Sequence, residues 1–158
     1  RFRPPCFAYY MEDAMSCVIL LAADHPMPLY DPELCRTYPA QANGDDVIME
    51  TPSFSIQLHE YYREAVEELG LEMKPWQYEL NLEAREDEAA LLRDYLKKHC
   101  LSREQVELWN LWIGDDREET IPCYRGRLAD LDGDTLDQLC NPPMHNDCPG
   151  QCRMIITI

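Results

Sequence analysis

Cysteine and histidine residues gather near the C-terminus, in a stretch that is rich in proline. Cys140, His145, Cys148 and Cys152 lie close together there. Thiolates and imidazoles are the ligands that zinc takes in tetrahedral sites. No two of these cysteines are separated by only two residues, so the spacing departs from the common zinc motifs. The sequence therefore allows a zinc site, structural or catalytic, with these four side chains as ligands.

The same positions also fit a fold without a metal. Cys140 follows Leu136 and Leu139 at helical spacing and would then end a helix that faces the core. Cys148 and Cys152 would be loop thiols or would form a local disulfide. The eight cysteines of the chain have no regular spacing, so we expect mostly buried, reduced thiols, which are typical of the cytoplasm.

Carboxylates form the second group of residues that could act on a partner. One row consists of Glu60, Glu64, Glu67 and Glu68, with Arg63 as the only nearby cation. A second group follows Gly114 as an acidic turn and consists of Asp115, Asp116, Glu118 and Glu119. Carboxylates on a rigid helix can imitate the phosphates of a duplex, and their charge steers them onto basic grooves. The alternative is that these residues are solvated helix faces whose charge serves solubility.

The charge of the whole chain favours the first interpretation. The sequence holds 30 acidic and 14 basic residues, which gives a formal net charge of -16 at pH 7. A small domain needs a net charge of only about 2 to 8 in magnitude for solubility. A field of this sign repels nucleic-acid backbones and anionic membranes, so we expect no direct binding to either. The charge instead favours a basic protein partner.

The sequence lacks the motifs of the common enzyme classes. Asp130, Asp132 and Asp134 suggest a calcium loop, but its glycine is fourth in that loop, where an EF-hand needs it sixth. His59 and Glu60 have no second histidine at the spacing of a zinc protease. Serine nucleophile elbows, phosphate-binding glycine loops and dinucleotide fingerprints are also missing. The sequence therefore gives no support to catalysis, and we expect Asp132 or Asp134 to cap a helix.

The first acidic row is positioned by a predicted helix from Thr51 to Leu69. A threonine and a proline open this stretch, apolar residues recur in it every three or four positions, and Gly70 ends it. A strand is predicted from Trp76 to Leu82, where apolar and polar residues alternate. A second helix is predicted from Glu83 to His99, with acids in its first turns and bases in its last, as the helix dipole favours.

The N-terminal part predicts a hairpin followed by a loop. Phe7–Met11 and Cys17–Ala23 are short apolar runs that indicate two paired strands. From Asp24 to Asp46 four prolines interrupt any regular element, which predicts a long loop lying over the core. Within that loop, Asn43 and Gly44 predict a turn.

The C-terminal part completes the fold prediction. Val106–Ile113 is apolar on both faces and predicts a central strand. Tyr124–Leu131 indicates a further strand, a short helix should run through Leu136, Leu139 and Cys140, and Met154–Ile158 should close the chain as a strand. We expect one domain over residues 1–158, of the α+β class. It should contain a mostly antiparallel sheet of about five or six strands, two main helices and a short third helix.

We interpret the chain as an acidic protein-binding inhibitor that blocks the basic groove of a nuclease or another nucleic-acid enzyme. In class it resembles the small acidic inhibitors of restriction nucleases, CRISPR nucleases and nuclease toxins, although no stretch carries a family motif. That resemblance implies a nucleic-acid mimic of the anti-restriction, anti-CRISPR or immunity type. The alternative is a zinc-binding module or metalloenzyme built on the C-terminal loop. A third interpretation is an accessory domain of a longer chain, because the sequence begins without methionine.

Overall fold

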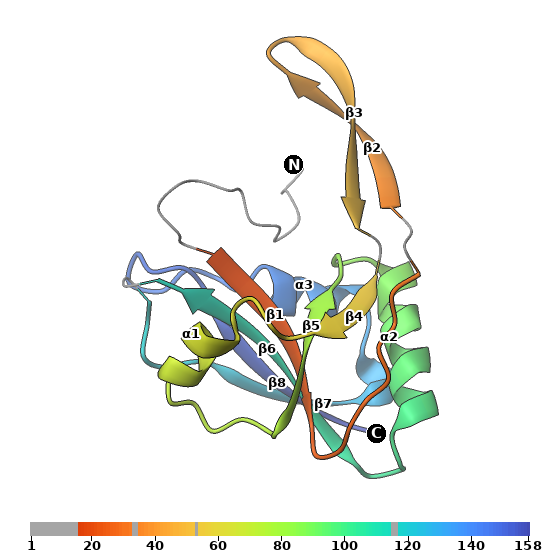
Figure 1. Ribbon diagram of the computed structural model, residues 1–158, viewed down its shortest axis with the longest axis vertical. Coiled ribbons are helices and arrows are strands. Elements are labelled where there is room, and N and C mark those ends of the chain that lie inside the picture. The colour runs from red at the N-terminus through yellow and green to blue at the C-terminus, as the bar shows by residue number, and fades with distance from the viewer. Residues whose placement is uncertain (1–15, 33–34, 53, 115–116) are drawn as a thin grey trace.

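A six-stranded sheet forms the body of the protein, and a two-stranded hairpin stands apart from it (Figure 1). The computed structural model describes residues 16–32, 35–52, 54–114 and 117–158. The main sheet has the strand order β4, β5, β1, β6, β8, β7, and all neighbouring pairs are antiparallel except β7 with β8. Its strands are β1 Ser16–Ala23, β4 Ser55–Leu58, β5 Trp76–Asn81, β6 Gln105–Ile113, β7 Cys123–Arg127 and β8 Cys152–Thr157. This arrangement confirms the predicted α+β class and its mostly antiparallel sheet.

Helices cover both faces of the main sheet. The helices are α1 Arg63–Glu68, α2 Glu86–His99 and α3 Gly133–Cys140, with a 3-10 turn at Leu128–Asp130. In strand β1, Ile19 and Leu21 join the core under α2 and α3, whereas Val18 and Leu20 join a second core under α1. Successive side chains of a strand point to opposite faces, so an apolar run such as this needs cover on both sides. The predicted central position of the neighbouring strand β6 is confirmed.

Helix α2 supplies a large part of the core on its face of the sheet. Leu92 and Leu96 are completely buried, and the acids of its first turn and the bases of its last turn complement the helix dipole. Asp132 caps the N-terminus of helix α3, because its carboxylate accepts a hydrogen bond from the Thr135 amide at 2.9 Å. The predictions of both helices are confirmed, although α2 begins at Glu86 rather than at the expected position.

The predicted helix from Thr51 to Leu69 is wrong over most of its length, because its first part belongs to two strands. Strand β3 extends through Pro52, β4 follows at Ser55–Leu58, and only α1 is helical. Phe54 and Ile56 alternate with polar neighbours; Ile56 is buried where β4 pairs with β5, and Phe54 is buried just before β4 begins. Helical spacing and strand alternation overlap in these residues, and burial against the sheet decides between them.

The end of this helix lies where the sequence predicts it. Gly70 has a φ angle of 64°, and its amide donates a hydrogen bond to the Glu67 carbonyl at 3.1 Å. Glycine adopts this left-handed conformation at little cost, which is why it so often follows a helix. The strand predicted next is also confirmed, since Tyr78 and Leu80 of β5 are buried and alternate with less buried neighbours.

The stretch predicted as a loop from Asp24 to Asp46 contains much of a β-hairpin. Strand β2 (Cys35–Ala42) pairs with β3 (Asp45–Pro52) across Asn43 and Gly44, whose φ angles are 54° and 84°. Two consecutive positive φ angles belong to a type I′ turn, which asparagine and glycine favour. A two-stranded ribbon has free edges, and there proline is tolerated. The loop prediction is therefore wrong here, whereas the predicted turn is confirmed.

The other strand predictions have mixed outcomes. Cys17–Ala23 is confirmed as part of β1, but its predicted partner Phe7–Met11 lies outside the described residues. Tyr124–Leu131 is confirmed only over β7, because a 3-10 turn follows that strand. The last predicted strand, Met154–Ile158, is confirmed as β8. No helix in the described ranges combines the length and the apolar character that crossing a membrane requires.

Candidate functional site

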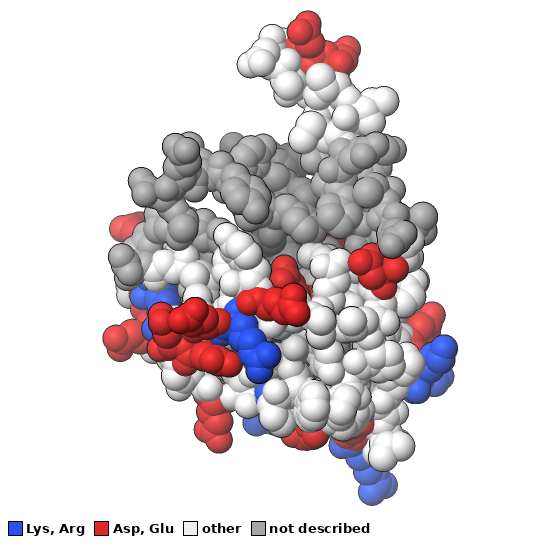
Figure 2. All heavy atoms as spheres, in the orientation of Figure 1, with Lys and Arg blue, Asp and Glu red and all other residues white. Residues whose placement is uncertain are grey.

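Exposed carboxylates surround helix α1, and we call this surface the acidic face. Its members are Glu60, Glu64, Glu67, Glu68 and Glu72, and each of them is exposed. Figure 2 shows acidic side chains gathered over α1, with few basic side chains among them. Between residues 58 and 73 the sequence holds one cation, Arg63, whose Nε donates to Glu67 Oε1 at 3.2 Å. The four carboxylates that the sequence indicates on this segment therefore lie together at the surface.

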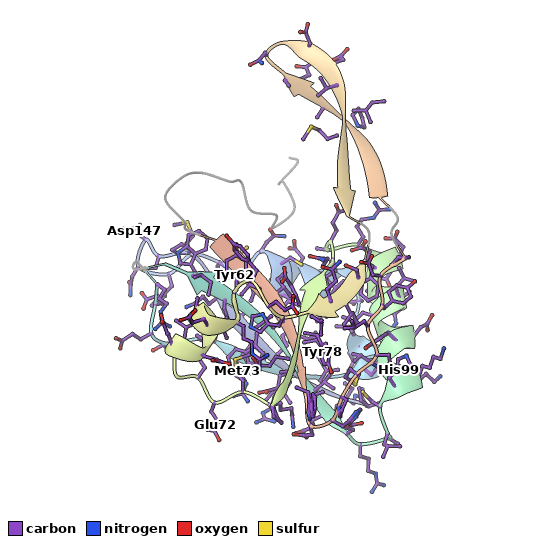
Figure 3. All side chains as sticks on the ribbon, in the orientation of Figure 1. Tyr62, Glu72, Met73, Tyr78, His99 and Asp147 are labelled. Atoms are coloured by element: carbon purple, nitrogen blue, oxygen red, sulfur yellow. The ribbon has the colours of Figure 1, made fainter. Side chains whose placement is uncertain are left out.

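The second core of the protein holds the acidic face in place. Val66 is 3% exposed and packs with β1 and β6, while Tyr62 and Met73 pack against the same cluster from either side of α1. Figure 3 shows Met73 turned toward the sheet and its neighbour Glu72 pointing away from it. Burial of these apolar side chains leaves the acidic side chains between them exposed to water, as expected for an amphipathic segment.

Part of the second predicted acidic group, Glu118 and Glu119, lies within the described residues. Ile113 and Ile121 flank it, and both pack against the core under α1. Glu119 is exposed, whereas Glu118 is half-buried. Oε1 of Glu118 lies 3.2 Å from His145 Nδ1, and its carbonyl accepts a hydrogen bond from Gln151. Asp115 and Asp116 lie outside the described residues. Of this group, Glu119 is thus the described residue with an exposed carboxylate.

A cavity of about 510 Å³ opens within the acidic face. It is lined by Leu58, His59, Glu60, Arg63, Glu67, Pro75, Trp76, Gln77 and Tyr78. These residues come from α1, from the end of β4, from the start of β5 and from the chain segments that join α1 to the two strands. Two carboxylates of the acidic face therefore border a hollow beside an indole ring that is itself 45% exposed.

His59 is the unusual member of this cavity. It is only 5% exposed, and neither ring nitrogen has a hydrogen-bond partner among the described residues. Burial lowers the pKa of the imidazole below its ordinary value, nearby Arg63 lowers the pKa further, and Glu67 partly opposes both. At neutral pH the ring is therefore uncharged and offers one nitrogen as an acceptor and the other as a donor. The sequence shows His59 only as half of an incomplete protease motif, so its burial could not be predicted from that pattern.

The four predicted zinc ligands near the C-terminus occupy different surroundings. Cys140 ends α3 and is buried, and Cys152 is buried at the start of β8, where burial and the neighbouring Cys123 raise the pKa of its thiol to about 12. His145 and Cys148 close a tight turn through two backbone hydrogen bonds of 3.2 and 2.9 Å. Within the described ranges, this set does not bring three ligand atoms within 4.8 Å of one another. Zinc binding by this loop stays a prediction.

A different group of ligand side chains does meet in space. His25, Cys100 and Glu104 bring a ring nitrogen, a thiol sulfur and a carboxylate oxygen within 4.8 Å of one another. All three side chains are half-buried. Burial raises the pKa of the Cys100 thiol to about 11, and the charge of Glu104 and a hydrogen bond to it add to this. His25 lies far from Cys100 and Glu104 in the sequence, and the three residues match no spacing motif, so only the fold reveals them.

Comparison with protein-family models, with curated proteins and with solved structures gives no match to this chain.

Proposed function

We propose that the protein binds a basic protein partner through the acidic face and inhibits it by occupying the groove that normally takes nucleic acid. The observation that carries this proposal is the excess of exposed carboxylates around α1. Residues 58–73 hold five carboxylates and one guanidinium, so this short segment has a net charge of -4. A negative field concentrated on one face speeds encounter with a positive groove and orients the two proteins.

The rigid support of the acidic face favours recognition over solubility as its role. Val66 is buried in the second core, and Gly70 ends the helix in a defined conformation. Carboxylates held on an ordered helix lose little further conformational freedom when a partner binds, which lowers the entropy cost of the complex. Charges that serve only solubility need no such support, since scattered positions serve equally well.

The cavity in the acidic face gives the partner an anchor point. Glu60 and Glu67 supply carboxylates, and Trp76 supplies an aromatic surface. A guanidinium pairs with carboxylates through two parallel hydrogen bonds and stacks on indole rings. An arginine side chain of the partner therefore suits this cavity, provided that Arg63 moves from its exposed ion pair with Glu67.

A cytoplasmic location is part of this proposal. Cys100, Cys123 and Cys152 have free thiols. Free thiols persist in reducing compartments, where nucleic-acid enzymes also work.

The experiment compares two variants that lose equal charge. The first removes the acidic row with Glu60→Gln, Glu64→Gln, Glu67→Gln and Glu68→Gln. The matched control removes four exposed carboxylates elsewhere with Asp45→Asn, Asp46→Asn, Asp94→Asn and Asp147→Asn. Each protein is used to capture partners from a cell lysate, and captured proteins are identified by mass spectrometry and purified. The nucleic-acid binding of each purified partner is then measured with and without the wild-type protein.

Support requires a basic nucleic-acid-binding protein whose binding to nucleic acid is competitively blocked by the wild type and by the Asp control. The Glu→Gln variant should bind it about a hundredfold more weakly. Equal affinity of both variants for the partner would show that the acidic face is not the binding surface. A partner that binds nucleic acid and this protein simultaneously would exclude the mimicry.

A further inference from the structure

We infer that His25, Cys100 and Glu104 form a binding site for a single divalent cation of the zinc type. These side chains come from two segments: His25 from the turn after β1, and Cys100 and Glu104 from the two ends of the turn between α2 and β6. Their ligand atoms already lie within 4.8 Å of one another. In a tetrahedral zinc site with bonds of about 2.0 to 2.3 Å, ligand atoms are roughly 3.3 to 3.6 Å apart. Small side-chain rotations therefore suffice to close the site around an ion.

The orientation of His25 suits a metal ligand. Its Nδ1 lies 2.9 Å from the carbonyl oxygen of Pro26, which can only accept, so Nδ1 carries a proton. Nε2 then points toward the other two side chains and lies 2.5 Å from Glu104 Oε1. Histidines that bind metals commonly donate their other ring nitrogen to a carbonyl in this way, which fixes the tautomer and the ring orientation. At this distance the two atoms share a proton, which a bound metal ion would replace as the atoms separate to the spacing of ligands in a zinc site.

Glu104 is held so that one oxygen remains for a ligand. Its Oε2 accepts a hydrogen bond from the Leu101 amide at 2.7 Å, which leaves Oε1 to face His25. The turn that carries it is fixed by the C-terminal residue, since Ile158 donates to the Glu104 carbonyl at 2.8 Å. Arg103 in this turn has a φ of 70°, which is uncommon for a residue with a side chain. Such conformations persist where the surrounding contacts enforce them, and they concentrate at functional sites.

The ligand types select the metal. One thiolate and one imidazole favour zinc over magnesium and calcium, which prefer oxygen ligands. Three protein ligands leave the fourth tetrahedral position open to water, as in zinc sites that act chemically. Cys100 also borders a cavity of about 650 Å³. The site is independent of the acidic face, so either proposal can fail without the other.

The test is a titration of the reduced, chelator-treated protein with Co²⁺, a spectroscopic substitute for zinc. Thiolate ligation produces a charge-transfer band in the near ultraviolet, and tetrahedral geometry produces visible bands. We expect one equivalent to bind, with the charge-transfer band abolished by Cys100→Ser and retained in Cys123→Ser and Cys148→Ser. His25→Ala and Glu104→Gln should weaken binding by about tenfold or more. Zinc should displace the cobalt.

Three outcomes would overturn the inference. The first is the absence of a saturable band, and the second is a band that survives Cys100→Ser. The third is a band lost with Cys148→Ser, which would assign the metal to the C-terminal loop instead. If Cys100→Ser unfolds, as judged by circular dichroism, His25→Ala decides the question, because this side chain is 38% exposed and its loss leaves the core intact. Unchanged affinity in that variant would then reject the site.

Discussion

The Nε atom of Arg153 donates a hydrogen bond to Oε2 of Glu107 at 3.0 Å, across the neighbouring strands β8 and β6. Glu107 is only 2% exposed, and its other oxygen accepts a hydrogen bond from the Lys74 amide at 2.7 Å. The guanidinium also lies 4.9 Å from the centre of the Trp109 ring. Because Lys74 belongs to the segment that links α1 to β5, this buried carboxylate ties the support of the acidic face to the centre of the sheet.

We expect Glu107→Ala to lower the free energy of unfolding by about 2 to 4 kcal/mol, because it leaves a guanidinium and an amide without their acceptor. The loss stays below that of a fully buried pair because Arg153 is 32% exposed and can reach water. Urea denaturation followed by circular dichroism measures it. The control is Glu72→Ala, at an exposed position of the segment that links α1 to β5. It should change the free energy of unfolding by less than about 0.5 kcal/mol. Equal stability of the two variants would contradict a structural role for the pair.

Acid should destabilise the protein through His59. Its folded-state pKa lies below the ordinary value of 6.5, so below that pH the unfolded chain binds more protons than the folded one. The stabilising contribution is therefore complete above about pH 6.5 and falls as the pH drops toward the folded-state pKa. The variant His59→Gln should lose less stability than the wild type between about pH 7.5 and 5.5. Urea denaturation at both values tests this, and an equal loss in both proteins would show that other groups govern the acid response.

The cavity residue Trp76 should contribute to partner binding separately from charge. We expect Trp76→Ala to weaken the complex about tenfold, through loss of the aromatic surface for a cationic side chain. The salt dependence of the affinity should stay unchanged, because no charge is removed. Isothermal titration with the purified partner at two salt concentrations measures both quantities. Leu101→Ala, at an 80% exposed position before β6, is the control. An affinity equal to that of the wild type would remove Trp76 from the binding surface.

The turn of the β2–β3 hairpin offers a test of local strain. Gly44 has a φ of 84° and no atom within 4 Å of the place where a Cβ would stand, so Gly44→Ala isolates the backbone cost. We expect about 1 kcal/mol of local destabilisation. Amide hydrogen exchange should therefore accelerate in β2 and β3 while the main sheet keeps its protection. Gly126→Ala, where the added Cβ would meet Ile156 at an ordinary 3.9 Å, should leave the hairpin unchanged. Unaltered exchange in Gly44→Ala would show that the turn is unstrained.

Elements with one clear period could be predicted from the sequence. Helix α2 has apolar residues at helical spacing together with complementary charges at both ends, and strand β6 has an apolar run that only a central strand can bury. Phe54 and Ile56 show where this approach fails, because their spacing suits a helix as well as a strand. Their burial in the core beside the β4–β5 pair depends on the whole sheet, which no local pattern contains.

The candidate sites, too, could be predicted from the sequence only in part. The position of Glu64, Glu67 and Glu68 on one short helix follows from their spacing, and their role in partner binding stays a prediction. The proximity of His25 to Cys100 and Glu104 depends on how β1, α2 and β6 pack, so it could not be predicted from the spacing of these residues in the sequence. The same holds for His59, whose burial depends on how the end of β4, α1 and the start of β5 pack together.

Strand β8 is the last strand of the main sheet in sequence, yet it lies between β6 and β7. Among the described strands, β7 has no other partner in that sheet. A ribosome adds about 5 to 20 residues per second, so β7 is synthesised before its partner β8. Its backbone groups lack their sheet partners until residues 152–157 have been made. The sheet therefore closes from within, when β8 inserts between β6 and β7, instead of growing outward strand by strand, and the body of the protein gains its full stability only after β8 has left the ribosome.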